Sequence, residues 1–191
     1  MSHRRRAARG LARFAIVSLL IATAACSASP TESQAQGRDG ACTLRDTNAV
    51  TVVIDFADLG REPFVGCAFS LPEHATGADA LGALGLSVTT VATAPQFICR
   101  LDNLPAPDQK VPIPGKESYT EACRNTPPQA AYWSYWYANP DTTASPTASS
   151  PPDWVYAIQG YAHHEVVFGG YEGYSFSHNL PKSEPPTMPG P

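Results

Sequence analysis

Residues 132–137 form an aromatic run, Tyr-Trp-Ser-Tyr-Trp-Tyr, which is the most distinctive chemical feature of the sequence. On a β-strand, alternate side chains share one face. The two sets are Trp133, Tyr135 and Tyr137, and Tyr132, Ser134 and Trp136. One set can fill a core while the other presents a flat surface that stacks on a sugar ring, a corrin or a partner protein. Alternatively, packing under residues 139–153 covers both sets. The residues predicted to bind a ligand are Tyr132, Trp133, Trp136 and Trp154.

A histidine pair suggests a second chemistry, metal binding or general-base catalysis. His163 and His164 precede Glu165, and all three are residue types that can ligate a metal. Adjacent residues on a strand point to opposite faces, so the two histidines are poorly placed to share one ion. The other candidates, His74 and His178, are distant in sequence. We therefore expect His163 and His164 to form a solvated surface pair, and we predict no metal site.

Nucleophilic and carboxylate catalysis lack the motifs they require. No Gly-x-Ser-x-Gly sequence is present, and Ser134 sits between bulky aromatic residues instead of on a tight turn. Two pairs of carboxylates are close in sequence, Asp55 with Asp58 and Asp102 with Asp108. Loop and strand-surface positions account for them better than a catalytic pair does. With no glycine-rich phosphate loop either, we expect a protein that is not an enzyme and has no catalytic cofactor.

Four of the five cysteines fall in the region expected to fold: Cys42, Cys67, Cys99 and Cys123. An even number of cysteines in an exported chain indicates disulfides, and four cysteines allow three pairings. We favour Cys42–Cys67 and Cys99–Cys123, because each pair flanks one predicted strand-and-loop unit. A metal site is the alternative, but there is no Cys-x-x-Cys spacing and an oxidising compartment disfavours free thiols.

The first 25 residues have the three parts of a secretory signal peptide. A basic region over residues 4–13 precedes an apolar run over 14–22, and small residues lead to Cys26. The apolar run is shorter than the ~20 residues that cross a bilayer, which disfavours a retained membrane helix. Ala-Ala-Cys at 24–26 fits a bacterial lipoprotein signal with Cys26 as the lipidated residue, although Thr23 stands where Leu or Val is usual. Cleavage at another small-residue site, without lipidation, is the alternative.

Polar segments flank the expected domain, which covers residues 41–178. Residues 26–40 are small and polar and read as a flexible tether. Residues 179–191 are proline-rich, and we expect them to be disordered. Removal of the segment before Cys26 takes away five of the 13 basic residues and none of the 17 acidic ones, which leaves a net charge of −9. So acidic a chain is a poor partner for nucleic acid.

Strand patterns dominate the domain and surround one short helix. The predicted strands cover residues 50–56, 64–69, 86–92, 96–101, 132–137, 154–157 and 173–176. Thr76 can cap the helix and Gly85 can end it, while the apolar stripe is Ala80, Leu81 and Leu84. One helix on one face of a mixed sheet is the α+β layout of a β-grasp. The pattern by itself supports an α+β, strand-rich fold and leaves the topology open.

Four short motifs add a family resemblance to this pattern. They are the strand over 50–56, the Thr-Gly-x-x-Ala-Leu helix start at 76–81, the Phe-Ile-Cys-Arg-Leu-Asp segment at 97–102, and the aromatic run with Trp154 and a Gly-x-Glu-Gly-Tyr-x-Phe ending at 170–176. With these motifs the sequence resembles the transcobalamin-like C-terminal domain family, small β-grasp domains of exported proteins. The resemblance implies a β-grasp-like domain that binds or interacts without catalysis. It does not supply a ligand.

Together, these predictions describe an exported, lipid-anchored, non-enzymatic module that binds a small molecule or cofactor at the outer face of the cell membrane. A structural or protein-interaction lipoprotein, with its aromatic residues in the core, is one alternative. A carbohydrate-binding or cell-wall-binding module that uses the aromatic face is another. The expected partners are thus a small ligand, a surface protein or a polysaccharide. The chain should contact the membrane only through its lipid, and not at all if it is secreted without one.

Overall fold

The computed structural model describes residues 34–140 and 152–188. The predicted signal peptide, Cys26 and the first part of the predicted tether lie outside the described residues, as do residues 141–151 and 189–191. No helix in the described ranges is long and apolar enough to cross a membrane.

A six-stranded sheet is the scaffold of the domain, with the strand order β1-β3-β2-β8-β6-β7. Its strands are β1 (Gln36–Asp39), β2 (Val50–Asp55), β3 (Phe64–Phe69), β6 (Ala131–Ala138), β7 (Val155–Tyr156) and β8 (Tyr171–His178). The central strands β2 and β8 are parallel, and every other neighbouring pair is antiparallel. Within the described residues, this mixed sheet with one short α-helix confirms the predicted α+β class.

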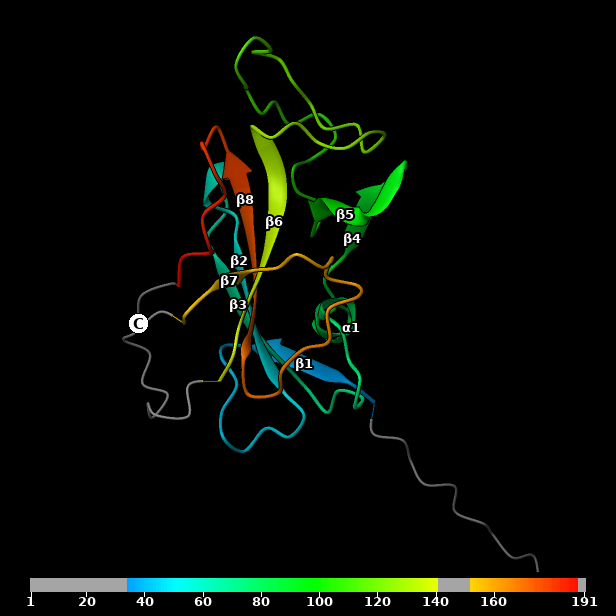
Figure 1. Ribbon diagram of the computed structural model, residues 1–191, viewed down its shortest axis with the longest axis vertical. Helices are drawn as coiled ribbons and strands as arrows, with labels where there is room; N and C mark the ends of the chain where they lie inside the picture. The colour runs from blue at the N-terminus through cyan, green and yellow to red at the C-terminus, as the bar shows by residue number, and fades with distance from the viewer. Residues whose placement is uncertain (1–33, 141–151, 189–191) are drawn as a thin grey trace, which may run out of the picture. The chain divides into compact units, whose positions relative to one another are not determined.

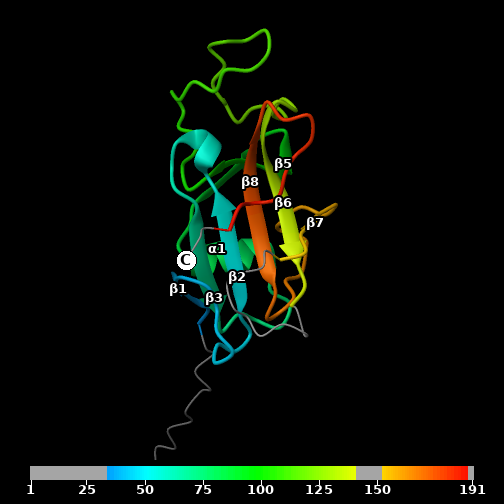
Figure 2. The same ribbon diagram turned by 90° about the vertical axis from the view of Figure 1, so that its left-hand side faces the viewer.

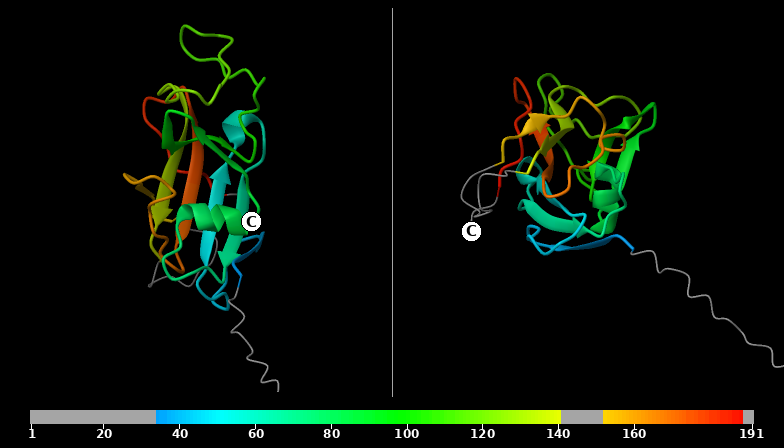
Figure 3. Two further views of the ribbon diagram at one scale, coloured as in Figure 1. Left: turned by 90° about the vertical axis from the view of Figure 1, so that its right-hand side faces the viewer. Right: turned by 60° about the horizontal axis from the view of Figure 1, so that its bottom comes forward.

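Helix α1 (Gly77–Ala83) lies across one face of the sheet, which we call the inner face (Figure 3). A second, two-stranded sheet of β4 (Val88–Val91) and β5 (Ala94–Leu101) lies on the same side as α1 (Figure 1). A 3-10 turn, η1 (Ala57–Leu59), follows β2. The long connection from β5 to β6 has no regular strand or helix. The opposite face of the six-stranded sheet, which we call the outer face, is not covered by any helix of residues 34–140 and 152–188.

The helix begins where the sequence predicts. The Asp79 carboxylate accepts a hydrogen bond from the Thr76 backbone N–H at 2.7 Å, and the Thr76 side chain accepts one from the Asp79 backbone N–H at 3.4 Å. This capping box satisfies N–H groups that have no partner within the helix. Gly85 follows the helix end with φ of 70°, a left-handed conformation that glycine adopts without strain.

The core lies between the inner face and α1. Inward-facing residues alternate along the central strands: Val50, Val52, Ile54 and Phe56, then Trp133 and Tyr135, then Tyr174 and Phe176. Trp133 packs edge-to-face on Phe56 and Phe176, with ring centroids 5.5 and 5.4 Å apart. The predicted division of residues 132–137 into two faces is confirmed, because a strand buried on both sides still alternates its side chains.

Residues 36–39, within the predicted flexible tether, form the edge strand β1 instead. The segment has no apolar side chain, so its order comes from backbone pairing with the open edge of β3 and from a contact with α1. At Gly37 an added Cβ would lie 2.5 Å from the Ala83 carbonyl oxygen, so only glycine permits this approach. Arg38 also pairs with Asp46 at 2.7 Å. A sheet edge thus orders residues that sequence pattern alone does not.

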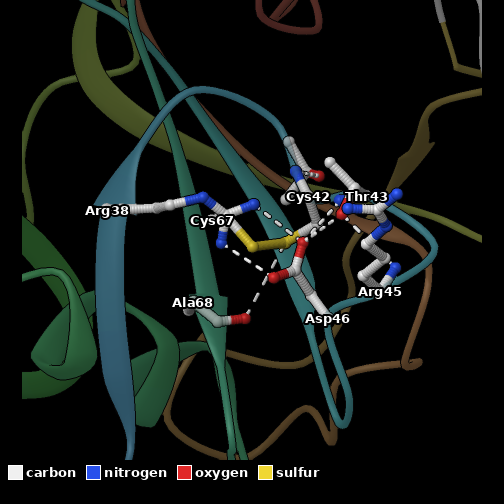
Figure 4. The surroundings of a disulfide bond; sticks show 8 residues. Arg38, Cys42, Thr43, Arg45, Asp46, Cys67 and Ala68 are labelled. Atoms are coloured by element: carbon white, nitrogen blue, oxygen red, sulfur yellow. Dashed lines mark hydrogen bonds and ion pairs between the residues drawn. A yellow bond between two sulfur atoms is a disulfide. The ribbon is translucent and has the colours of Figure 1, made fainter.

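Both predicted disulfides are present with the predicted pairing. Cys42–Cys67 joins the segment before β2 to β3, with Cα atoms 4.8 Å apart, and the Arg38–Asp46 ion pair lies beside it (Figure 4). Cys99–Cys123 joins β5 to the long β5–β6 connection, with Cα atoms 5.4 Å apart. Two disulfides indicate an oxidising, extracytoplasmic environment.

Candidate functional site

The outer face of β6 and β8 carries the candidate binding site. Three cross-strand pairs lie on this face: Tyr132–Ser177, Ser134–Ser175 and Trp136–Gly173. Trp154, which precedes β7, lies over Gly173, and its ring reaches within 2.6 Å of the position that a Cβ would take there. We call the following residues the outer-face site: Ser134, Trp136, Trp154, Gly173, Ser175 and Ser177.

Some polar atoms of the outer-face site are paired and others are not. The Ser134 hydroxyl lies 2.8 Å from the Ser175 hydroxyl and accepts a hydrogen bond from Trp136 Nε1 at 2.9 Å. In contrast, Trp154 Nε1 and Ser177 Oγ are buried and have no hydrogen-bond partner among the described residues. Buried polar atoms without partners are rare in proteins. These two atoms therefore retain unused hydrogen-bonding capacity.

The C-terminal residues cover this site. Pro186 is buried, and its ring lies 2.9 Å from the Cβ position at Gly173. The Ser175 hydroxyl donates a hydrogen bond to the Glu184 carbonyl, and the Thr187 N–H donates one to Asp55 Oδ2 at 3.0 Å. Figure 2 shows this segment, in red, running across β8. The structure thus differs from the predicted disorder over residues 179–188, because contacts with the sheet hold the segment there.

The structure separates the four aromatic residues predicted to bind a ligand. Tyr132, Trp136 and Trp154 belong to the outer side of the sheet. Trp133 points into the core, where it is 6% exposed and donates a hydrogen bond from Nε1 to the Leu104 carbonyl at 3.1 Å. Trp136 is 9% exposed. Neither tryptophan of β6 is an open stacking platform. Phe56, Phe176 and Leu104 surround Trp133 in the core, and the ring of Tyr156 packs against Trp136 on the outer face.

A second polar cluster lies on the inner face, and sequence reasoning missed it. Glu172 is 1% exposed, and its carboxyl group accepts a hydrogen bond from the Tyr135 hydroxyl. The Tyr135 hydroxyl also lies 3.0 Å from His164 Nδ1, which is 3.9 Å from Glu172 Oε1. The ring of Tyr137 packs against the imidazole, with centroids 4.4 Å apart. Alternation along β8 could have identified Glu172, since it shares a face with the core residue Tyr174.

Burial controls protonation in this cluster. It raises the pKa of Glu172 to about 8, and the hydrogen bond from Tyr135 only partly opposes this. Burial also raises the pKa of Tyr135 and of Tyr174 and lowers the pKa of His164. Each shift favours the uncharged form, because a low-dielectric interior penalises charge. The cluster is therefore a network of neutral hydrogen-bonding groups near pH 7, which suits a structural role.

The prediction of a solvated histidine pair is wrong for His164. Residues 161–163 form a turn and not a strand, so the two side chains do not alternate as predicted. His163 is exposed, whereas the His164 side chain is 16% exposed and reaches Tyr135. On the protein surface, Glu165 pairs with His74 at 3.2 Å, and this contact raises the pKa of His74.

The carboxylates considered for catalysis have separate structural partners. Asp55 accepts hydrogen bonds from the backbone N–H groups of Ala57 and Thr187, and Asp102 pairs with Arg61 at 2.7 Å. In the part of the chain that the structure describes, two groups of residues have metal-ligating side chains close together: Cys42, Asp46 and Cys67, and Cys99, Glu121 and Cys123. In each group the two cysteines are joined in a disulfide.

Comparisons of this chain with protein-family models, with curated proteins and with solved structures gave no match. The outer-face site and the inner cluster are therefore interpreted from their own geometry.

Proposed function

We propose that this chain is an exported, lipid-anchored module that binds a small molecule or cofactor at the extracytoplasmic face and catalyses no reaction. One observation carries the proposal: the outer-face site combines aromatic rings with two buried polar atoms, Trp154 Nε1 and Ser177 Oγ, that have no partner among the described residues. Small-molecule sites have this composition, in which apolar rings supply contact area and a few polar atoms fix the orientation of the ligand. The cover over the site has no regular secondary structure at residues 183–188, so it can move without breaking a sheet pairing.

Export and anchoring are supported by the N-terminal sequence and by the disulfides. The basic region, apolar run and small residues before Cys26 are typical of a lipoprotein signal, and Cys26 is the proposed lipid acceptor. Disulfides form and persist in extracytoplasmic compartments. An anchored module of this kind presents its binding site to the outside of the cell.

A β-grasp assignment is also part of the proposal, and the strand arrangement supports it. The sheet is mixed, the hairpin of β2 and β3 precedes α1, and α1 lies on one face. The fourth motif of the resemblance to the transcobalamin-like C-terminal domain family has two parts that are neighbours in the sheet. The aromatic run is β6, and the 170–176 ending lies in the adjacent strand β8 and just before it. This adjacency supports a shared binding function for the two parts.

A ligand panel tests the proposed function. The full chain is titrated with cobalamin, a second tetrapyrrole and cell-wall polysaccharide, and thermal stability and tryptophan fluorescence are recorded. Ser177→Ala should weaken binding of the active ligand by about tenfold or more, because one hydrogen bond to the ligand is lost. The matched control Ser87→Ala changes an exposed serine near the two-stranded sheet and should bind as the wild type does. Binding that is equal in both variants, or absent for the whole panel, contradicts the proposal.

A protein-interaction function is the second candidate, favoured by the edge of the sheet at β7. Val155 and Tyr156 form this edge strand and are partly exposed, and Ile158 just beyond it is 97% exposed. An edge strand has unpaired backbone groups that can add a strand from another protein. Ile158→Asp should weaken binding of a surface protein at this edge and leave small-molecule binding unchanged.

A further inference from the structure

Residues 183–188, which we call the tail strap, contact the sheet through their backbone at two points. The Glu184 carbonyl accepts a hydrogen bond from Ser175 Oγ, and the Thr187 N–H donates one to Asp55 Oδ2 at 3.0 Å. The Glu184 and Thr187 residues themselves are exposed. Among the described residues, the sheet thus hydrogen-bonds the backbone of the strap at these two positions and not the side chains of Glu184 and Thr187.

Between these two backbone contacts, one proline ring enters the outer-face site. Pro186 is buried, whereas the preceding Pro185 is exposed. The rings of Pro186 and Trp154 both come within 3.0 Å of the Cβ position at Gly173, at 2.9 and 2.6 Å, so the missing side chain makes room for both rings. Aromatic rings that hold a proline, together with hydrogen bonds to an extended backbone, are the usual means of recognising proline-rich segments.

The strap leaves part of the outer-face site unused. The six-membered ring of Trp154 meets Pro186 over Gly173, but its Nε1 on the other side of the indole has no partner in the described ranges. Ser177 Oγ, two residues along β8 from Ser175, also lacks one. A ligand that supplies acceptors to these atoms gains hydrogen bonds that the strap does not make. The strap is therefore an incomplete fit and can be displaced.

We propose that the outer-face site recognises extended, proline-containing polypeptide segments and that the tail strap occupies it in cis as a displaceable ligand. This inference goes beyond the proposed function, because it uses the same site but assigns a polypeptide segment to it in place of a small molecule. A short tether holds such an intramolecular ligand at an effective concentration on the order of millimolar. Any other ligand of the site must compete against that concentration.

A pair of full-length variants tests the inference. Pro186→Asp places a charge on the buried proline position and should release the strap, whereas Pro185→Asp adds the same charge at an exposed position and should not. A synthetic peptide of residues 181–188 is then added in trans. The peptide contains no aromatic residue, so the intrinsic tryptophan fluorescence of the chain reports its binding. We expect the peptide to bind the Pro186→Asp chain at least about tenfold more tightly than the wild type or the Pro185→Asp chain.

Two further measurements keep the test decisive. A peptide that itself carries Pro186→Asp should bind none of the chains. Thr187→Pro removes the N–H group that donates a hydrogen bond to Asp55, so it should release the strap, and this chain should also bind the wild-type peptide. If Pro186→Asp does not fold, Thr187→Pro serves as the release variant in its place. Equal binding of the peptide by all chains, or no binding by a folded release variant, overturns the inference.

The outcomes also separate this inference from the proposed function. If a member of the ligand panel binds in a Ser177-dependent way while the peptide binds no release variant, the tail-strap inference fails and the small-molecule function stands. If the peptide binds the release variants and no panel member binds them, the small-molecule function fails and the inference stands.

Discussion

The hydroxyl group of Tyr135 on β6 donates a hydrogen bond to the carboxyl group of Glu172 on β8, inside the core of the domain. The two residues are diagonal neighbours, since Tyr135 is directly opposite Tyr174 and Glu172 is opposite Tyr137. An added Cβ on Gly77, the first residue of α1, would lie 3.1 Å from the same hydroxyl oxygen, so the helix closes over this contact. The buried carboxyl group therefore has a defined partner and little access to water.

The buried carboxyl group of Glu172 should make stability depend on pH. Its pKa is about 8 in the folded chain against an ordinary value of 4.5, so between these values the folded chain holds a proton that the unfolded chain releases. The contribution of Glu172 to the free energy of unfolding should then fall as pH rises from about 5 to about 8, by up to about 1.4 kcal/mol per pH unit. Glu172→Gln should remove this slope in urea-unfolding experiments.

The matched control for that experiment is Glu62→Gln, which changes an exposed glutamate near the start of β3 and should keep the slope of the wild type. An identical pH dependence in Glu172→Gln and wild type would show that Glu172 does not titrate in this range.

Two serines of the outer-face site should respond differently to replacement by alanine. Ser177→Ala removes a buried hydroxyl that has no partner among the described residues, so the free energy of unfolding should stay the same or rise by up to about 1 kcal/mol. Ser134→Ala removes the acceptor of Trp136 Nε1 and the neighbour of the Ser175 hydroxyl, and should lower it by about 1–3 kcal/mol. Chemical unfolding measures both, and a larger loss for Ser177→Ala than for Ser134→Ala would contradict this description of the site.

Two glycines should show whether β1 belongs to the fold. Gly37→Ala places a Cβ 2.5 Å from the Ala83 carbonyl oxygen and should separate β1 from α1. Amide hydrogen exchange over residues 36–39 should then become faster. Gly82→Ala changes an exposed helix position with open space around it and should stabilise the chain by up to about 1 kcal/mol. Unchanged exchange over residues 36–39 in Gly37→Ala would mean that the β1 contact is not tight.

The two disulfides should contribute similar amounts to stability. They close loops of nearly equal sequence separation, 25 residues for Cys42–Cys67 and 24 for Cys99–Cys123. Loop-closure entropy in the unfolded chain predicts a loss of about 3 kcal/mol for each when both of its cysteines are replaced by alanine. Thermal unfolding of the two double variants measures this, and very unequal losses would show that native packing around one bridge outweighs the chain entropy.

Features that depend on neighbouring residues were predictable from the sequence. The helix cap at Thr76 needs only Asp79 three positions later, and the two faces of residues 132–137 follow from the alternation of a strand. The pairing of Cys42 with Cys67 followed from the strand that separates them. In each case the determining interactions lie within one element or one strand-and-loop unit.

Contacts between distant segments were decided only by the tertiary structure. The parallel pairing of β2 with β8 brings the start of the domain beside its end, and no local pattern encodes that choice. It positions Asp55 to hold the Thr187 N–H, which orders a proline-rich tail that composition alone assigns to disorder. A turn in place of a strand likewise directs His164 toward Tyr135.

The sequence by itself thus determined the α+β class, the helix, most strands and the disulfide pairs, because periodicity, capping and cysteine number are local or countable properties. The tertiary structure alone decided which polar groups became buried and what covers the outer-face site. Burial depends on which surfaces meet once the sheet has formed, and for Glu172 and Pro186 those surfaces come from segments far apart in the chain.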